Sequence, residues 1–149
     1  MNSSINITTK LKSRVETNYI VLHHSATTRK SKCDVFDIHR WHIEKGWSGI
    51  GYHFVIEKDG TLRSGRPLNS VGAHCKDHNS DSIGICMVGG LDDNGKVVDN
   101  FDESQYKTLQ TLVVMLQEVY PSATFVKHKD LAPTECNEAN IDKIKEHIR

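Results

Sequence analysis

The chain has 149 residues, a length that fits one globular domain with its own hydrophobic core. Lys plus Arg and Asp plus Glu both number 19, so the net charge is zero, and neither nucleic acid nor an anionic membrane is expected as the main partner. No apolar stretch is long enough to span a membrane, and the polar N-terminus lacks the apolar segment of a signal peptide. We therefore expect a protein that is made and folded in a cytoplasm.

Histidine is frequent in this chain, which contains nine of these residues. Because histidine is the commonest metal ligand and the usual acid or base near neutral pH, this number favours a metal site or a proton-transfer site. The four cysteines form no Cys-x-x-Cys pair, and the chain is too long for a disulfide scaffold, so we expect free thiols.

The first half of the chain shows three patterns of secondary structure. A continuous apolar run over 18–23 predicts a central strand that is buried on both faces and ends in histidine. Helical spacing of apolar residues, with a glycine at the end, predicts a helix over 34–46. The pair Asp59-Gly60 between two strand-like runs predicts a hairpin over 52–65.

The second half of the chain adds two strands and two helices. An apolar segment predicts another central strand over 82–90, and a short final strand is expected over 123–128. The clearest helix covers 101–121, with one apolar stripe and a proline at its end, and a terminal helix is expected over 140–148. Strands alternating with helices, plus one hairpin, predict an α/β fold: a single domain with a central mixed β-sheet flanked by about three α-helices.

Two of the predicted strands end in histidine. One ends at His23 and His24, the other at His128, and an irregular loop after His128 leads to Cys136. Imidazole and thiolate groups are natural ligands for zinc, and three protein ligands with one open position are typical of catalytic zinc. Side chains alternate along a strand, so His23 and His24 are expected on opposite faces. From these residues alone, structural histidines and a buried structural cysteine remain the alternative.

Five segments together carry a resemblance to a known family: VLHHSATT, WHIEKGWSGIGYHFVIEKDGTLRSGR, VGAHCKDHNSDSIGICMVGG, FDESQYKTLQTL and KHKDLAPTEC. In this order and spacing they resemble the zinc-dependent N-acetylmuramoyl-L-alanine amidases, a group that includes the animal peptidoglycan recognition proteins. The likeness is greatest to the short amidase-type lysozymes of tailed bacteriophages, and it covers about residues 18–148. It implies an amidase domain over 18–149, preceded by a polar lead-in over 1–17.

The resemblance also implies a set of site residues. His23, His128 and Cys136 match the family's three ligands for one zinc ion. Tyr52 matches the catalytic tyrosine, and Thr134 lies at a catalytic position where some relatives carry lysine and others threonine. A tyrosine hydroxyl can orient the attacking water or hydrogen-bond the developing oxyanion, and a threonine can donate to the same oxyanion as a neutral group.

The remaining histidines are expected to differ in role. His74 lies in a polar loop and matches a histidine that many relatives place near the cleft, so the resemblance implies contact with substrate. His53 should face away from its neighbour Tyr52, as a structural residue or as a partner of a ligand. His24 falls where relatives vary and is expected to be only a neighbour of the metal. Three further histidines are expected on helices, as surface or packing residues: His39, His42 and His147.

The activity that the resemblance implies is hydrolysis of the amide bond between the lactyl group of N-acetylmuramic acid and L-alanine in peptidoglycan, during phage lysis. A monomeric enzyme in the host cytoplasm then needs a membrane-permeabilising partner, such as a holin, to reach the wall. Three alternatives stay open: a module that binds peptidoglycan without cutting it, a regulator that binds and inhibits a phage RNA polymerase, and a cytosolic amidase that recycles wall fragments. Cys136 and Tyr52 favour an enzyme, because non-catalytic relatives often lose the cysteine.

Overall fold

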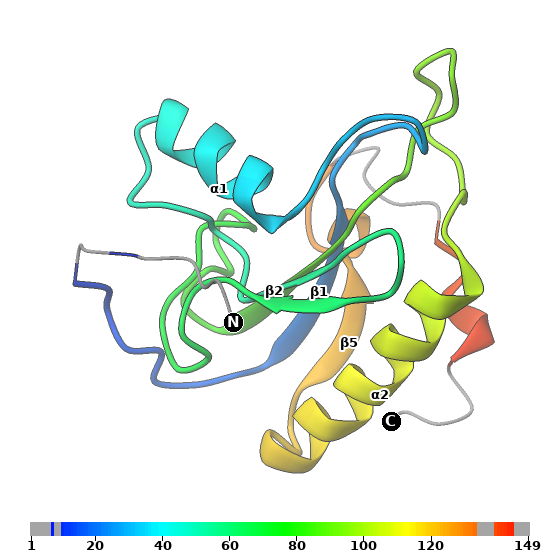
Figure 1. Ribbon diagram of the computed structural model, residues 1–149. Helices are drawn as coiled ribbons and strands as arrows, with labels where there is room; N and C mark the ends of the chain where they lie inside the picture. Colours follow the sequence, from blue (N-terminus) through cyan, green and yellow to red (C-terminus); the bar gives the residue numbers. More distant parts are fainter. Residues whose placement is uncertain (1–6, 8–9, 134–138, 145–149) are drawn as a thin grey trace.

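The computed structural model describes residue 7, residues 10–133 and residues 139–144, without the side chain of residue 143. Its centre is a five-stranded sheet in the order β3-β2-β4-β1-β5 (Figure 1). Only β3 is antiparallel to its neighbour β2, and the other adjacent strands pair in parallel, so the predicted mixed sheet is confirmed. The strands are β1 (Tyr19–His24), β2 (Phe54–Ile56), β3 (Leu62–Ser64), β4 (Ser82–Met87) and β5 (Thr124–Lys127).

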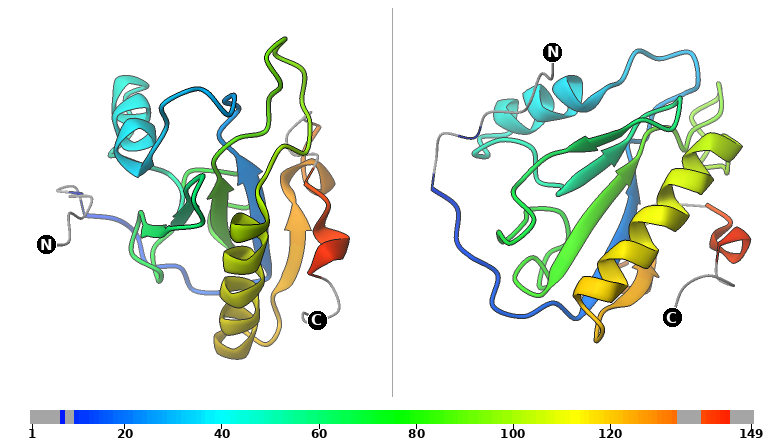
Figure 2. Two further views of the ribbon diagram at one scale, coloured as in Figure 1. Left: turned by 45° about the vertical axis from the view of Figure 1, so that its right-hand side comes forward. Right: turned by 60° about the horizontal axis from the view of Figure 1, so that its bottom comes forward.

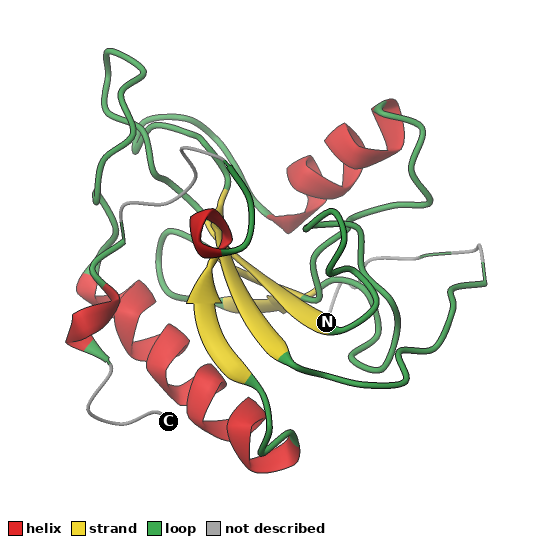
Figure 3. Cartoon of the chain, turned by 180° about the vertical axis from the view of Figure 1, so that it is seen from behind, coloured by secondary structure: helices red, strands yellow, loops and turns green. Residues whose placement is uncertain are grey.

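Two α-helices cover opposite faces of this sheet (Figure 2). They are α1 (Val35–Glu44) and α2 (Glu103–Val119). Figure 3 shows from behind that the strands lie between the two helices. Two short 3₁₀ turns follow later in the chain, η1 (His128–Asp130) and η2 (Ile141–Lys143). None of the helices in the described ranges has the length and apolar character needed to cross a bilayer.

The expectation of about three α-helices is too high for the described residues, which form two. Where a helix was predicted over 140–148, residues 141–143 form the 3₁₀ turn η2, and residues 145–149 lie outside the described part. Ile141 and Ile144 are both buried against the core beneath α2. Because side chains three positions apart lie on the same side of a 3₁₀ turn, this single turn buries both of them.

Alternation along the two central strands separates the core under α2 from the opposite face. In β1, Ile20 and Leu22 belong to the cluster that packs on α2. In β4 the residues on that side are Ile83, Ile85 and Met87. Successive side chains of a strand point to opposite faces, so the intervening residues face α1. The α2 face of these two strands is therefore filled mainly by large aliphatic side chains.

The apolar stripe of α2 is confirmed over most of its predicted length. Tyr106, Leu109, Leu112 and Leu116 are buried in the core, as the helical spacing predicts. Val119, at the end of the predicted stripe, is 61% exposed instead.

The segment before β1 is tied to the rest of the domain through Arg14. Its backbone N–H donates to Asn69 O at 2.6 Å, and its Nη1 donates to Leu68 O and Ser70 O at 2.6 Å and 3.0 Å. The guanidinium carbon also lies 5.3 Å from the centre of the Tyr120 ring, a cation–π arrangement. The part of the polar lead-in around Arg14 therefore packs on the domain.

Two histidines of α1 hold the loop that leads from this helix into β2. His39 Nδ1 accepts a hydrogen bond from the backbone N–H of Ile50 at 3.0 Å, and His42 Nδ1 accepts one from Gly51 at 2.8 Å. Burial lowers the pKa of His42 to about 4, so this ring is neutral and keeps the lone pair that the bond requires. Both histidines act as packing residues, and the loop that carries Tyr52 is fixed as a result.

His53 links three parts of the chain from a buried position. Its Nδ1 accepts from the backbone N–H of Gly84 in β4 at 3.0 Å, and its Nε2 donates to Ser70 O at 2.8 Å. Only 1% of the residue is exposed, and this burial lowers its pKa to about 4. Both ring nitrogens are used, so His53 is the satisfied structural histidine that was one of its two expected roles.

The lowered pKa of His53 predicts a loss of stability in acid. As the pH falls from about 6.5 to about 4, the unfolded state binds a proton at this ring before the native state does. The free energy of unfolding therefore decreases with falling pH, by up to about 1.4 kcal/mol per pH unit for this group. Urea denaturation of the chelator-treated protein across this range measures the slope. In His53→Asn, which keeps an acceptor for Gly84, the slope is shallower by up to this amount, and equal slopes would contradict the assignment.

Candidate active site

His23 is the residue from which the candidate site is built. It lies near the end of β1 on the face toward α1, and only 2% of it is exposed. Three aromatic side chains surround its ring, with centroid distances of 4.4 Å to His128, 5.0 Å to His74 and 5.1 Å to Tyr52. Four residues from four separate segments are therefore brought together. His23 and His128 lie at the carboxyl ends of β1 and β5, whereas Tyr52 lies just before the start of β2.

His128 reaches His23 because β5 pairs in parallel with β1. Lys127 lies beside Leu22, so the next residue, His128, follows at the level of His23. It is the first residue of η1, directly after β5 ends at Lys127. Its Nδ1, like that of His24, is buried and has no hydrogen-bond partner in the described structure, and of these two rings His128 is the one that packs against His23. Burial lowers the pKa of this ring, so the ring is neutral and Nδ1 can offer a lone pair to a metal ion. A buried nitrogen without a partner is costly unless a ligand binds it.

His24 points to the other face of β1, as the alternation of a strand requires. Its ring packs against Gly90, where a Cβ atom would lie 1.8 Å from Nδ1 of His24. The ring of His24 thus points away from the ring of His23.

His74 is placed against His23 by two glycines. A Cβ atom on Gly84 of β4 would lie 2.6 Å from Cγ of His74, and one on Gly72 would lie 2.6 Å from Cδ2. The side chain of Asn79 fixes the loop itself, because its Oδ1 accepts from the backbone N–H groups of His74 and Cys75 at 2.7 Å and 2.9 Å. The ring of His74 therefore occupies a space that only these small residues leave open.

Hydrogen bonds connect His23, His74 and Ser82 in sequence. Nε2 of His23 lies 2.9 Å from Nδ1 of His74, and Nε2 of His74 lies 3.1 Å from Oγ of Ser82. Burial lowers the pKa of both His23 and His74 well below the ordinary value, and the neighbouring histidines lower it further. Both rings are therefore neutral at physiological pH.

Tyr52 and His74 both line a pocket of about 400 Å³ next to His23. The pocket also contains Trp47 and the two cationic side chains of Lys45 and Lys76. Lys45 Nζ lies 5.1 Å from the centre of the Trp47 ring, so this cation and this aromatic face form one wall. The pocket can accept a ligand with apolar surface and negative charge.

Two predicted site residues, Thr134 and Cys136, lie outside the described residues, so their placement is not part of this geometry. Within the described ranges no cluster of three His, Cys, Asp or Glu side chains could hold a metal ion. The structure does bring together His23 and His128, two of the three predicted ligands. Two neutral imidazoles are donors that fit zinc.

Ser82 is the residue that the sequence reasoning missed. A signal for it exists in β4, where Ser82, Gly84 and Cys86 alternate with large aliphatic residues. Small side chains on one face of an otherwise bulky strand indicate that another side chain lies over them. Here that side chain is His74.

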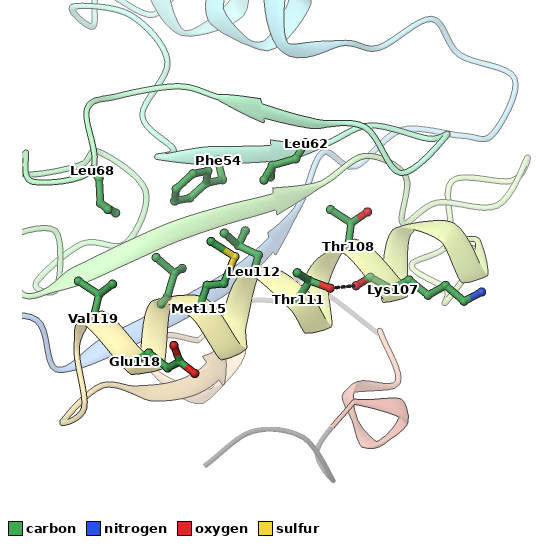
Figure 4. Close-up of a pocket in the computed structure, with 11 residues that line it drawn as sticks. Phe54, Leu62, Leu68, Lys107, Thr108, Thr111, Leu112, Met115, Glu118 and Val119 are labelled. Carbon is green, nitrogen blue, oxygen red and sulfur yellow. Dashed lines mark hydrogen bonds between the residues drawn. The ribbon is translucent and has the colours of Figure 1, made fainter.

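A larger groove of about 570 Å³ lies elsewhere, between α2 and the hairpin of β2 and β3 (Figure 4). Its walls include Phe54 and Leu62 on one side and Met115 and Val119 on the other. None of its lining residues is a histidine or a cysteine, and it shares no residue with the site around His23. The candidate chemistry is therefore confined to the smaller pocket.

Comparisons with known proteins identify the family of this chain. A family model described as N-acetylmuramoyl-L-alanine amidase matches residues 13–141. An endolysin of Escherichia phage T7 is 42% identical over 127 residues, which cover 85% of this chain and 84% of that protein. Peptidoglycan-recognition protein SC2 of Drosophila melanogaster is 32% identical over 130 residues, with 83% and 70% covered. Among solved structures, the endolysin amidase LysCS of Clostridium intestinale has a TM-score of 0.84 at 32% identity, with 99% and 94% covered.

The chain therefore belongs to the N-acetylmuramoyl-L-alanine amidase family, and it is an amidase of the type found in phage endolysins.

The contact between Gly84 and His74 gives a test of the site's packing. Gly84→Ala places a methyl group against the His74 ring and should destabilise the fold by about 1–3 kcal/mol, the usual cost of overpacking. The matched control is the same substitution in a His74→Ala background, where the methyl group has space. Denaturant unfolding of the two single variants and the double variant gives the coupling. Additive effects would contradict the contact.

Proposed function

We propose that this chain is a zinc-dependent peptidoglycan amidase that cleaves the bond between the lactyl group of N-acetylmuramic acid and L-alanine. The observation that carries the proposal is the partnerless, buried Nδ1 of His128 beside the ring of His23. Two adjacent neutral imidazoles at the edge of a pocket are suited to bind a metal ion, and the family membership indicates which reaction follows.

The proposed ligands are His23, His128 and Cys136. Nε2 of His23 is hydrogen-bonded to His74, and Nδ1 of His128 is buried without a partner in the described structure, so we propose that each histidine binds the metal through Nδ1. The thiolate of Cys136, eight positions after His128, completes the set by its match to the family pattern. When bound, zinc supplies a water of lowered pKa and polarises the amide carbonyl.

The chain's own residues bind and orient the substrate. Tyr52 lies beside His23 and lines the pocket, where its hydroxyl hydrogen-bonds the oxygen on which negative charge develops. Thr134 is proposed to donate to the same oxygen, without the charge of a lysine. Lys45, Lys76 and Trp47 suit a peptide that bears carboxylates and is joined to a sugar.

The biological setting that we propose is phage lysis, with the enzyme in the host cytoplasm until a holin or similar partner opens the membrane. The similarity to phage endolysins supports this setting. The main alternative is a module that holds peptidoglycan without cutting it. Inhibition of a phage RNA polymerase, and recycling of wall fragments, stay predictions from the sequence.

Digestion of purified sacculi tests the proposed reaction. The metal-replete protein should release free stem peptides and leave the glycan strands intact, as identified by mass. A chelator should abolish release and zinc should restore it. Cys136→Ala should abolish release, whereas Cys33→Ala, which removes a buried free thiol outside the site, should not. Cut glycan strands, or release that ignores chelation, would contradict the proposal, and sacculi that are bound without release would favour the binding module.

The role of Tyr52 has a separate test. Tyr52→Phe removes one hydroxyl and should lower kcat by roughly 100-fold, the usual effect of losing one donor to an oxyanion. Zinc content should stay unchanged, because the tyrosine is not a proposed ligand. The control is Tyr19→Phe, at the opposite end of β1, which should keep wild-type kcat. A kcat equal to wild type in Tyr52→Phe would exclude this role.

A further inference from the structure

We propose that Ser82 and His74 act as positioning residues that fix the tautomer of His23. Through two hydrogen bonds, Ser82 determines that His23 carries its proton on Nε2 and presents the lone pair of Nδ1. This inference rests on the zinc site proposed above, because a tautomer matters at His23 only if Nδ1 binds a metal. It assigns to His74 a role different from the expected contact with substrate.

The Ser82 hydroxyl has a single proton to donate. Oγ of Ser82 lies 2.6 Å from the carbonyl oxygen of His78, and a carbonyl oxygen can only accept. The hydroxyl proton is therefore donated to His78. In its second contact, with Nε2 of His74 at 3.1 Å, the same oxygen must accept. It follows that His74 carries its proton on Nε2.

Counting the ring protons in the same way then determines the tautomer of His23. A neutral imidazole has one N–H, so Nδ1 of His74 has a lone pair and accepts the hydrogen bond at 2.9 Å. The donor of that bond is Nε2 of His23. With its proton on Nε2, His23 has a lone pair on Nδ1. A serine in β4 thus determines which nitrogen of a residue in β1 is available for a metal.

The tight packing of the His74 ring, which lies between Ser82 and His23, supports the proposed effect of Ser82 on His23. Gly72 and Gly84 leave space for His74 and no more, since a Cβ at either would lie 2.6 Å from a ring atom. Asn79 holds the backbone of His74 from the other side. A flip of the ring would replace Nδ1 by Cδ2 and Nε2 by Cε1, and both hydrogen bonds would be lost. Both nitrogens are engaged, so His74 lines the pocket but has no ring N–H to donate to a substrate.

Ring-nitrogen NMR of the metal-free protein at neutral pH tests the tautomers without any zinc. His23 and His74 should both show the proton on Nε2, with His23 Nδ1 in the range of an unprotonated nitrogen. In Ser82→Ala, His74 loses the hydroxyl that accepts from its Nε2 and keeps only its backbone contact with residue 82, so the other tautomer of His74 should become populated. A proton on Nδ1 of His23, or an unchanged His74 in Ser82→Ala, would overturn the proposal.

Zinc affinity provides the second readout, with two matched amide variants. In His74→Asn, the side-chain oxygen can replace Nδ1 as acceptor for His23, so most of the affinity should remain. In His74→Gln, the amide reaches the position of Nε2 and the acceptor for His23 is lost, so affinity should fall by roughly 10–100-fold, as for other partners of ligating histidines. Competition with a chromogenic chelator measures both, and circular dichroism checks the fold.

The outcomes separate the two proposals. Equal affinity of the Asn and Gln variants, both folded, would overturn the role of His74 as a positioning residue while leaving the metal site intact. A wild-type protein that binds no zinc would instead overturn the proposed zinc function. In that case the NMR result alone would confirm or overturn the tautomers of His23 and His74.

Discussion

β1 and β4 pair in parallel at the centre of the sheet, and their register decides which side chains can meet above it. The register sets Tyr19 beside Ser82 and His23 beside Cys86. Ile20 and Leu22 of β1 are buried beneath α2 together with the aliphatic residues of β4. The alternate residues, among them His23, must therefore face the other side of the sheet. A slip by one residue would move His23 beneath α2, and the site would be lost together with the core.

The frequent histidines serve two distinct purposes in this structure. His39, His42 and His53 accept backbone N–H groups and connect loops to helices and strands. His23 and His128 meet at the pocket instead. The sequence alone could not separate these two groups, because the residue type is the same in a structural histidine and in a histidine at the pocket. What separates them is whether a ring is held by backbone N–H groups or meets another histidine, which depends on residues far away in the chain.

The sequence predicted most of the fold because its signals were local. The apolar run of β1, the stripe of α2 and the Asp59-Gly60 turn of the hairpin each lie within one short segment. The terminal helix was not found in the described residues, because Ile141 and Ile144 are also compatible with a single 3₁₀ turn. The contact of His74 with His23 was beyond sequence reasoning, since it depends on the space that glycines of two other segments leave.

The order in which the site's residues are synthesised has a consequence for folding. β1 is made early, yet it completes its pairing only with β4 and finally with β5, the last strand of the sheet. Contacts between distant segments form late, because the intervening chain must first be closed into loops. On the ribosome, β1 is thus made well before β5 and His128, its later neighbours. His23 and His128 can come together only after the whole chain between them has been synthesised.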